Sequence, residues 1–245
     1  MFIIKSFDEK NANDGIMELL LAVATMKKEG AESVTAIIPF FPYSMPSSGE
    51  IHNEVTEGMD FFTCFGADLV KMLEAIGCDE IITLNTSMSA PKGFASTCRF
   101  LNVEATELVA PYLIYSGIKD PVIVGARSNR LHLKAVNQLY KTLGLFNFKC
   151  GMGFYNQNDY IGEDYKGRDV VLFTNMLRTG ATVSKLSREI KKKGARNIYC
   201  YGFHGSCTSE QLVKLSDELP VKELIMTNTI QHSYEVVFIV FRIKK

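Results

Sequence analysis

Apolar residues follow two alternating patterns along this chain. Short runs rich in Val, Ile and Phe predict buried strands, and segments with apolar positions three or four residues apart predict amphipathic helices. Strand-like runs occur at residues 2–4, 34–41, 81–84, 121–124, 148–154, 170–173, 197–203 and 223–227. Helical spacing occurs at residues 16–26, 69–76, 107–115, 133–143 and 183–193. Because strands and helices alternate, we predict an α/β fold with parallel sheets flanked by helices.

The alternation of strands and helices stops and restarts once along the chain. The restart lies near residue 117, so we divide the chain into two similar halves, 1–117 and 118–245. Two stretches, 42–66 and 155–167, have little periodicity and are predicted as long loops. Loops of this length inside a compact domain are usually either functional lids or disordered.

Composition narrows the class of protein. The chain has 245 residues, of which 47% are apolar and 22% charged, and its formal net charge is zero. These values are typical of globular proteins, and the balanced charge argues against a nucleic-acid-binding surface. No apolar run is long enough to span a bilayer, so we expect no membrane partner. The six cysteines lack metal-ligand spacing, which favours reduced thiols in a core and a cytoplasmic location.

The most informative segment for function is the turn Arg-Thr-Gly-Ala-Thr. It follows a strand-like run and precedes the helical segment 183–193. Such a turn exposes backbone N–H groups at the positive end of the helix dipole, which suits phosphate binding. The predicted phosphate-binding residues are Arg178, Thr179, Gly180, Ala181 and Thr182. Arg178 is either an added cation for the anion or a solvated side chain.

Six other segments, in order along the chain, resemble the ribose-phosphate pyrophosphokinase (PRPP synthetase) family. One is similar to the family's helix start N-D-x-x-M-E-L-L, and the next is similar to its I-P-x-F-P-Y segment. The six segments are residues 13–20, 38–43, 81–84, 194–199, 204–205 and 227–230. The similarity runs from about Phe2 to Ile230.

The resemblance implies two tandem phosphoribosyltransferase-like domains. The N-terminal one, 1–117, is expected to lack the family's first β-unit, and the C-terminal one, 118–245, to carry the phosphate-binding turn. The resemblance also implies a hexamer built from dimers, and transfer of a diphosphoryl group from Mg-ATP to O1 of ribose 5-phosphate. This chemistry depends on positioning and charge neutralisation, so each family position can be checked against this sequence.

Most family positions for nucleotide, metal and ribose carry other residues here. The arginine of the ATP loop, the metal-binding histidine, one aspartate and the acidic pair beside the phosphate turn are replaced. These degenerate positions are Met45, Ser87, Asn129, Thr174 and Asn175. The stretch 153–159, which corresponds to the family's catalytic flap, contains no Lys or Arg.

The substitutions lead us to expect no catalytic residue, no metal site and no cofactor in this chain. The first hypothesis is a PRPP synthetase-like protein of nucleotide metabolism that is non-catalytic alone and partners an active homologue or a second copy. The second is a sensor that binds ribose 5-phosphate or another anion. The third is an active enzyme that holds Mg²⁺ and ATP through other ligands, such as Asp159, Glu163 or Asp164. The fourth is a decaying copy without a selected role.

Three further features affect this interpretation. His204, at a strand end, is either a site residue or simply hydrogen-bonded. The lysines at 191–193 are predicted to be a solvated helix end. The apolar segment Val236–Ile243 is either a buried last strand or a truncated end whose apolar face needs another chain.

Overall fold

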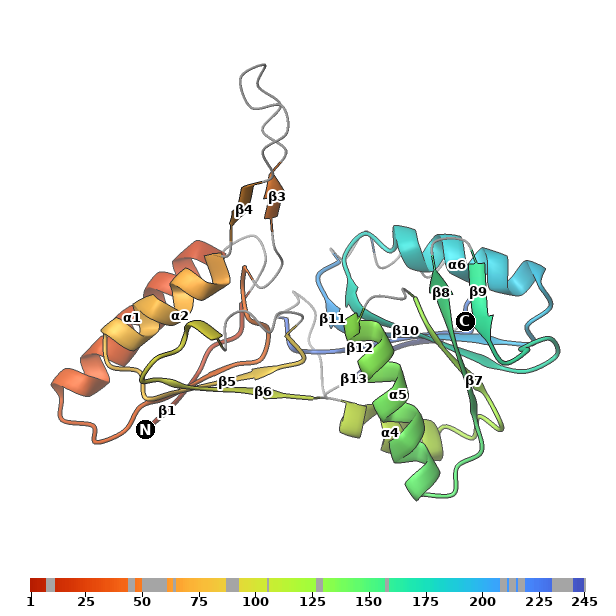
Figure 1. Cartoon of the computed structure of the whole chain (residues 1–245), viewed down its shortest axis with the longest axis horizontal. Coiled ribbons are helices and arrows are strands. Elements are labelled where there is room, and N and C mark those ends of the chain that lie inside the picture. The colour runs from red at the N-terminus through yellow and green to blue at the C-terminus, as the bar shows by residue number, and fades with distance from the viewer. Residues whose placement is uncertain are drawn as a thin grey trace, which may run out of the picture. The chain divides into compact units, whose positions relative to one another are not determined.

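The fold consists of two compact units, and each has its own sheet. The computed structural model describes residues 1–7, 12–43, 47–49, 61–63, 65–86, 93–104, 106–126, 130–156, 159–207, 211, 215, 219–230 and 240–244. Unit 1 is Met1–Val103 and unit 2 is Glu104–Lys245 (Figure 1). The α/β fold with parallel sheets flanked by helices is confirmed.

Unit 1 contains a four-stranded parallel sheet in the order β1-β2-β5-β6. Its two long helices lie on one face of that sheet (Figure 1) and bury apolar side chains such as Leu19, Val23 and Leu73 against it. A separate antiparallel pair, β3 and β4, lies within the predicted loop 42–66. The elements are β1 Phe2–Ile4, α1 Ala12–Lys28, β2 Thr35–Ile38, β3 Ser47–Gly49, β4 Phe61–Thr63, α2 Phe65–Ala75, β5 Glu80–Leu84 and β6 Arg99–Val103.

A carboxylate joins α2 to the loop that leads into β6. Glu74 accepts hydrogen bonds from the backbone N–H groups of Ser96, Thr97 and Cys98 and from the Thr97 hydroxyl. These bonds, that from the Thr97 N–H first, lower the pKa of Glu74 to about 2. The ionised Glu74 carboxylate therefore fixes residues 96–98, which lead into the edge strand β6.

Unit 2 contains a seven-stranded sheet in the order β13-β12-β11-β10-β7-β8-β9. The five strands from β12 to β8 are parallel, and the two edge strands are antiparallel to their neighbours. The elements are α4 Thr106–Tyr115, β7 Val122–Gly125, α5 Arg130–Leu145, β8 Gly151–Asn156, β9 Asp159–Gly162, β10 Val170–Leu177, α6 Ala181–Lys192, β11 Ile198–Gly205, β12 Glu223–Thr227 and β13 Val240–Lys244.

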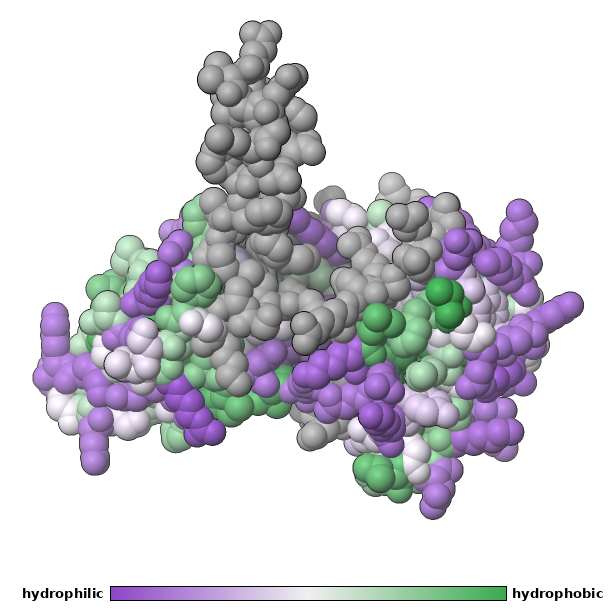
Figure 2. All heavy atoms as spheres, viewed as in Figure 1, coloured by the Kyte–Doolittle hydropathy of each residue, from purple (hydrophilic) through white to green (hydrophobic). Residues whose placement is uncertain are grey.

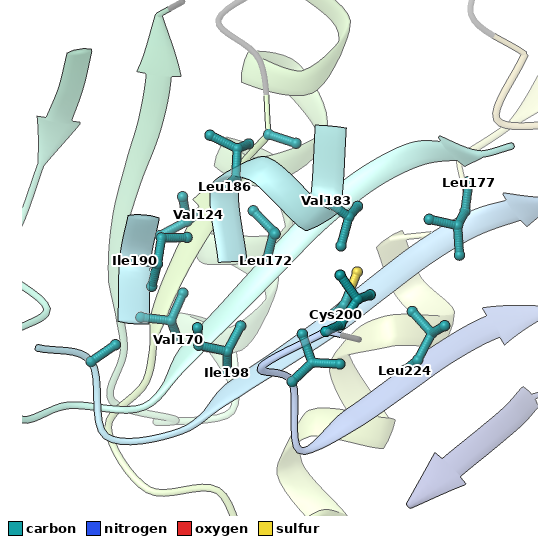
Figure 3. Close-up of a cluster of buried hydrophobic side chains, with 14 of the residues drawn as sticks. Val124, Val170, Leu172, Leu177, Val183, Leu186, Ile190, Ile198, Cys200 and Leu224 are labelled. Atoms are coloured by element: carbon teal, nitrogen blue, oxygen red, sulfur yellow. The ribbon is translucent and has the colours of Figure 1, made fainter. Parts of the chain in front are cut away.

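The core of unit 2 lies between α6 and the central strands (Figure 3). Val183, Leu186 and Ile190 occupy one stripe of α6 and pack on β10 and β11, whose residues are buried almost throughout. Full burial of one large apolar side chain contributes about 1.5–3 kcal/mol. This packing fixes where α6 begins relative to the end of β10, and so fixes the turn between them.

The boundary between the units differs from the prediction. The units divide between Val103 and Glu104, not near residue 117, because α4 packs in unit 2. Its residues Val109 and Leu113 are fully buried. The Tyr112 hydroxyl also donates a hydrogen bond of 2.9 Å to Glu223 in β12.

Two predicted segments lie at the edges of the unit 2 sheet, and the first of them differs from its prediction. The predicted loop 155–167 contains β9, which forms a hairpin with β8. In the apolar segment Val236–Ile243, residues 240–243 belong to β13, which pairs antiparallel with β12. Residues 236–239 lie outside the described part of the chain.

Thiols and lysines in the described residues match their predicted environments. Cys78, Cys98, Cys200 and Cys207 are buried free thiols, and burial raises the pKa of Cys200 to about 12. The lysines at 191–193 are exposed, and hydrophilic residues predominate around α6 in Figure 2. In the described ranges, no helix is long and apolar enough to cross a membrane.

Candidate phosphate-binding site

The predicted phosphate-binding turn lies at the carboxyl edge of the unit 2 sheet. β10 runs parallel to β7 and β11, and three residues separate the end of β10 from the start of α6. Ligands of open α/β sheets bind at this edge, outside the carboxyl ends of the strands. Of the predicted residues, Arg178, Thr179 and Ala181 are exposed, Thr182 is half-buried and Gly180 is buried.

Gly180 sets the shape of the turn. Its φ is 70° and its ψ is 1°, a left-handed conformation that favours glycine. A Cβ atom at this position would lie 2.2 Å from Cδ2 of Leu215, so the backbone also approaches another part of unit 2 closely. The Gly180 carbonyl accepts a 2.7 Å hydrogen bond from the Ser184 N–H, which starts the helical ladder. Glycine is therefore required twice, for its φ and for its size.

The first turn of α6 presents backbone donors. Gly180 occupies the N-cap position, and no side-chain hydrogen bond caps the helix there. The Ala181 N–H makes only a long contact, 3.4 Å, to the Thr179 hydroxyl oxygen. Backbone N–H groups at a helix start, together with the helix dipole, attract anions. This arrangement can hold a phosphate group, with Arg178 exposed at its entrance.

Thr174 and Asn175, near the end of β10, carry no charge. Thr174 is 6% exposed, and its hydroxyl donates a 3.1 Å hydrogen bond to the Met176 carbonyl, so the side chain folds back on its own strand. Asn175 is half-buried. A divalent cation beside a sugar phosphate requires oxygen ligands, usually carboxylates. Thr174 and Asn175 supply at most neutral oxygens.

The ends of the neighbouring strands complete this edge. The Ser206 N–H donates to the Leu177 carbonyl at 2.8 Å, which ties the end of β11 to the end of β10. His204 is 2% exposed, and its Nδ1 lies 2.7 Å from the Thr229 hydroxyl just after β12. His204 is thus hydrogen-bonded, as one of its two predicted alternatives states.

The comparisons with known proteins agree on one family. The model for the N-terminal domain of ribose phosphate pyrophosphokinase matches residues 1–55. The ribose-phosphate pyrophosphokinase of Vibrio vulnificus strain YJ016 is 23% identical over 245 residues, which cover 96% of this chain and 73% of that protein. The Helicobacter pylori protein of the same name is 25% identical, with coverage of 89% and 66%. The chain therefore resembles the ribose-phosphate pyrophosphokinase family over nearly its whole length.

A solved structure supports the same fold. The crystal structure of phosphoribosylpyrophosphate synthetase from Mycobacterium smegmatis superposes with a TM-score of 0.76 at 21% identity, over 94% of this chain and 72% of that one. This family's fold therefore extends over both units. Met45, Ser87 and Asn129, three of the positions predicted to be degenerate, lie outside the described residues.

The stretch 153–159, predicted to correspond to the family's flap, falls in the β8–β9 pair. Residues 153–159 span the end of β8 and the start of β9, and the strands pair up to the connecting residues. The Tyr155 and Tyr165 hydroxyls lie 2.8 Å apart in the interior, and the Tyr160 ring contacts both tyrosines. Lys193, just past the C-terminal end of α6, lies 5.6 Å from the Tyr155 ring centroid. The hairpin base is thus fixed near the end of α6 opposite to the phosphate turn.

Two of the acids proposed as substitute metal ligands make contacts within unit 2. Glu163 forms an ion pair with Arg168 at 3.3 Å, and the Asp164 carboxylate accepts the Lys166 N–H at 2.9 Å. Asp159 begins β9. Within the described ranges, no three His, Cys, Asp or Glu side chains form a group that could hold a metal ion. Glu163 and Asp164 thus make their contacts in the connection between β9 and β10.

The carboxyl end of β5 in unit 1 is also polar. The Asn102 amide bonds the backbone of Thr86, accepting its N–H at 3.1 Å and donating to its carbonyl at 3.3 Å. Asn85 has a φ of 47°. The Thr83 and Thr86 hydroxyls are buried without a hydrogen-bond partner among the described residues.

Sequence reasoning missed two contributions to the unit 2 site. Leu215 packs against Gly180, and Thr229, just after β12, bonds His204. Thr227–Ile230 had matched the family pattern, which was the available signal. Its partner His204 is distant in sequence, so the contact could not be derived from spacing.

Proposed function

We propose that this chain is a PRPP synthetase-like protein of nucleotide metabolism that binds ribose 5-phosphate, or a related phosphate, without turning it over alone. In this proposal it acts in the cytoplasm as the partner subunit of an active homologue. One observation carries the proposal: Gly180 forms a left-handed turn at the start of α6 with no side-chain cap, whereas Thr174 and Asn175 beside it are neutral.

The energetics of phosphoryl transfer support this choice. The reaction needs cations to neutralise charge that develops on the transferred group, and the loss of one such contact costs about 10³-fold or more in rate. The turn alone supplies helix-end donors and one arginine. These groups suit binding of a phosphate far better than they suit activation of ATP.

Calorimetry with ribose 5-phosphate, with and without Mg²⁺, tests the binding step. We expect binding that is independent of Mg²⁺, because Thr174 and Asn175 offer no carboxylate for a cation. Arg178→Ala should weaken binding about tenfold, since a charge-assisted hydrogen bond to the phosphate is lost. Arg188→Ala, an exposed arginine on the outside of α6, is the matched control and should leave affinity unchanged.

An assay for PRPP formation and a co-purification experiment test the other steps. The chain alone should form no PRPP from ATP and ribose 5-phosphate, and it should co-purify with an active family member. Turnover by the chain alone at rates typical of the family would refute the non-catalytic assignment. Absence of ribose 5-phosphate binding would refute the role of the turn.

A sensor is the second candidate, and the exposure of Arg178 at the turn favours it. A sensor would bind the sugar phosphate equally well but would not associate with an active homologue. Binding without co-purification would therefore replace the partner role with the sensor.

A further inference from the structure

Three hydrogen bonds form a buried relay between β11 and the segment after β12. The Thr227 hydroxyl donates to the Phe203 carbonyl at 2.6 Å, and it lies 2.9 Å from the Thr229 hydroxyl. The Thr229 hydroxyl lies 2.7 Å from Nδ1 of His204. His204, Thr227 and Thr229 are each at most 5% exposed, so water is nearly excluded from the relay.

The direction of the relay follows from counting protons, because each hydroxyl has only one to donate. Thr227 uses its proton on the Phe203 carbonyl, which can only accept. The bond between the two threonines must therefore use the proton of Thr229. Thr229 has none left for the ring, so the hydrogen in the last bond belongs to Nδ1 of His204.

We propose that this relay holds His204 in the Nδ1–H tautomer. Held in this way, His204 is the positioning residue for Thr227–Ile230 at the carboxyl edge of the unit 2 sheet. Within this segment Asn228 is exposed, between the buried Thr227 and Thr229. The relay thus presents one amide side chain at the carboxyl edge. An amide suits the hydroxyl groups of a sugar phosphate, as donor and as acceptor.

The strand register places this segment beside the turn. Met176 pairs with His204, and His204 pairs with Thr227, so the ends of β10, β11 and β12 follow one another along the edge. The β11–β12 register shifts between Gly202 and His204. Such irregularities redirect side chains and are frequent next to functional sites. The shift brings His204 opposite Thr227 and within reach of Thr229.

The ring plane of His204 is fixed independently of the relay. The Phe203 ring meets the imidazole edge to face, with 4.7 Å between centroids and an interplanar angle of 86°. A buried ring fixed in this way keeps its Nδ1–H directed at one acceptor. Loss of that acceptor would leave a buried donor unsatisfied, which is unfavourable.

Nitrogen-detected NMR of the histidine-labelled full chain tests the tautomer directly. At a pH where the ring is neutral, Nδ1 should give the protonated, pyrrole-type signal and Nε2 the unprotonated, pyridine-type signal. The opposite assignment would overturn the proposal. Thr229→Ser, which keeps the hydroxyl, should preserve the pattern, whereas Thr229→Val should allow both tautomers.

Two variants that replace the His204 ring with an amide side chain distinguish positioning of Thr229 from simple packing of the ring. His204→Asn places an N–H donor near the position of Nδ1, whereas His204→Gln places its amide near Nε2. The backbone amide of Thr229 should exchange with solvent at the wild-type rate in His204→Asn and about tenfold faster in His204→Gln and Thr229→Val. Equal exchange in the two His204 variants would refute positioning by the Nδ1–H.

The ligand part of the inference rests on the proposed function and has its own readout. Ribose 5-phosphate affinity should remain within about threefold in His204→Asn and Thr229→Ser and should fall about tenfold in His204→Gln and Thr229→Val. If wild-type protein does not bind ribose 5-phosphate, the proposed function fails, while the NMR and exchange results still decide the relay. Unchanged affinity in all four variants would show that the segment does not serve the ligand.

Discussion

Gly180→Ala is the sharpest test of the phosphate turn. The residue has a φ of 70°, and an L-residue in the left-handed region costs about 1–2 kcal/mol. The new Cβ would lie 2.2 Å from Cδ2 of Leu215, 2.7 Å from Cδ1 and 3.0 Å from Cγ, so Leu215 or the turn must move. Overpacking of a buried site costs about 1–3 kcal/mol. The sum predicts a loss of about 2–5 kcal/mol in unfolding free energy.

Gly167→Ala is a matched control for the cost of placing an L-residue in the left-handed backbone conformation. Gly167 has a φ of 73° and lies in the same unit, but an added Cβ there would meet nothing within 4 Å. This variant should therefore lose only the backbone cost of about 1–2 kcal/mol. The difference between the two variants measures the collision with Leu215.

The assay combines thermal and urea unfolding of both variants with calorimetry of ribose 5-phosphate binding. For a unit of this size, 1 kcal/mol corresponds to about 2–4 °C in Tm. Gly180→Ala should unfold several degrees below Gly167→Ala and should bind more weakly, because the donors of the turn are displaced. Equal Tm values would show that Leu215 does not constrain the turn. Wild-type affinity in Gly180→Ala would show that the anion binds elsewhere.

Three further predictions concern stability. Burial opposes ionisation of Asp169, but the hydrogen-bonded guanidinium of Arg196 outweighs it and lowers the pKa of Asp169. Asp169→Asn should therefore lower the unfolding free energy by about 1–3 kcal/mol above pH 4. In urea unfolding followed against pH, this advantage of the wild type should disappear as the pH falls through the native pKa. Backbone hydrogen bonds lower the pKa of Glu74 to about 2, so the advantage of wild type over Glu74→Gln should be complete above about pH 4.5 and lost as the pH approaches 2; a constant advantage would refute the ionised role. Tyr165→Phe leaves the buried Tyr155 hydroxyl without that partner and should cost about 1–3 kcal/mol, more than Tyr160→Phe in the same unfolding assay.

Periodicity predicted the elements whose apolar face is continuous. α6 was found because Val183, Leu186 and Ile190 repeat at helical spacing, and β10 because its residues are buried on both faces. β6 was missed because Arg99–Val103 has only two apolar residues in a row and is mostly exposed, so it contains no long apolar run. The β8–β9 hairpin was missed for a similar reason: Asp159–Gly162 has only two apolar residues.

The unit boundary depended on packing that the sequence pattern does not specify. α4 is apolar around most of its circumference, so its pattern indicates burial but not the sheet that buries it. The packing of α4 on α5 and the Tyr112–Glu223 hydrogen bond place the helix in unit 2. At the candidate site, the turn at residues 178–182 could be predicted from its local sequence. The His204–Thr229 contact could not, because it depends on the register shift between β11 and β12.

The neutral residues beside the turn change the kind of site that this edge can form. A carboxylate at position 174 or 175 would repel a phosphate unless a cation lay between them, so such a site binds its ligand together with a metal ion. Thr174 instead uses its hydroxyl within its own strand, and Arg178 is exposed in the turn. The electrostatics therefore favour an anion without a cation. The lack of acids at positions 174 and 175 and the charge of Arg178 act in the same direction, because each raises the positive potential at the start of α6.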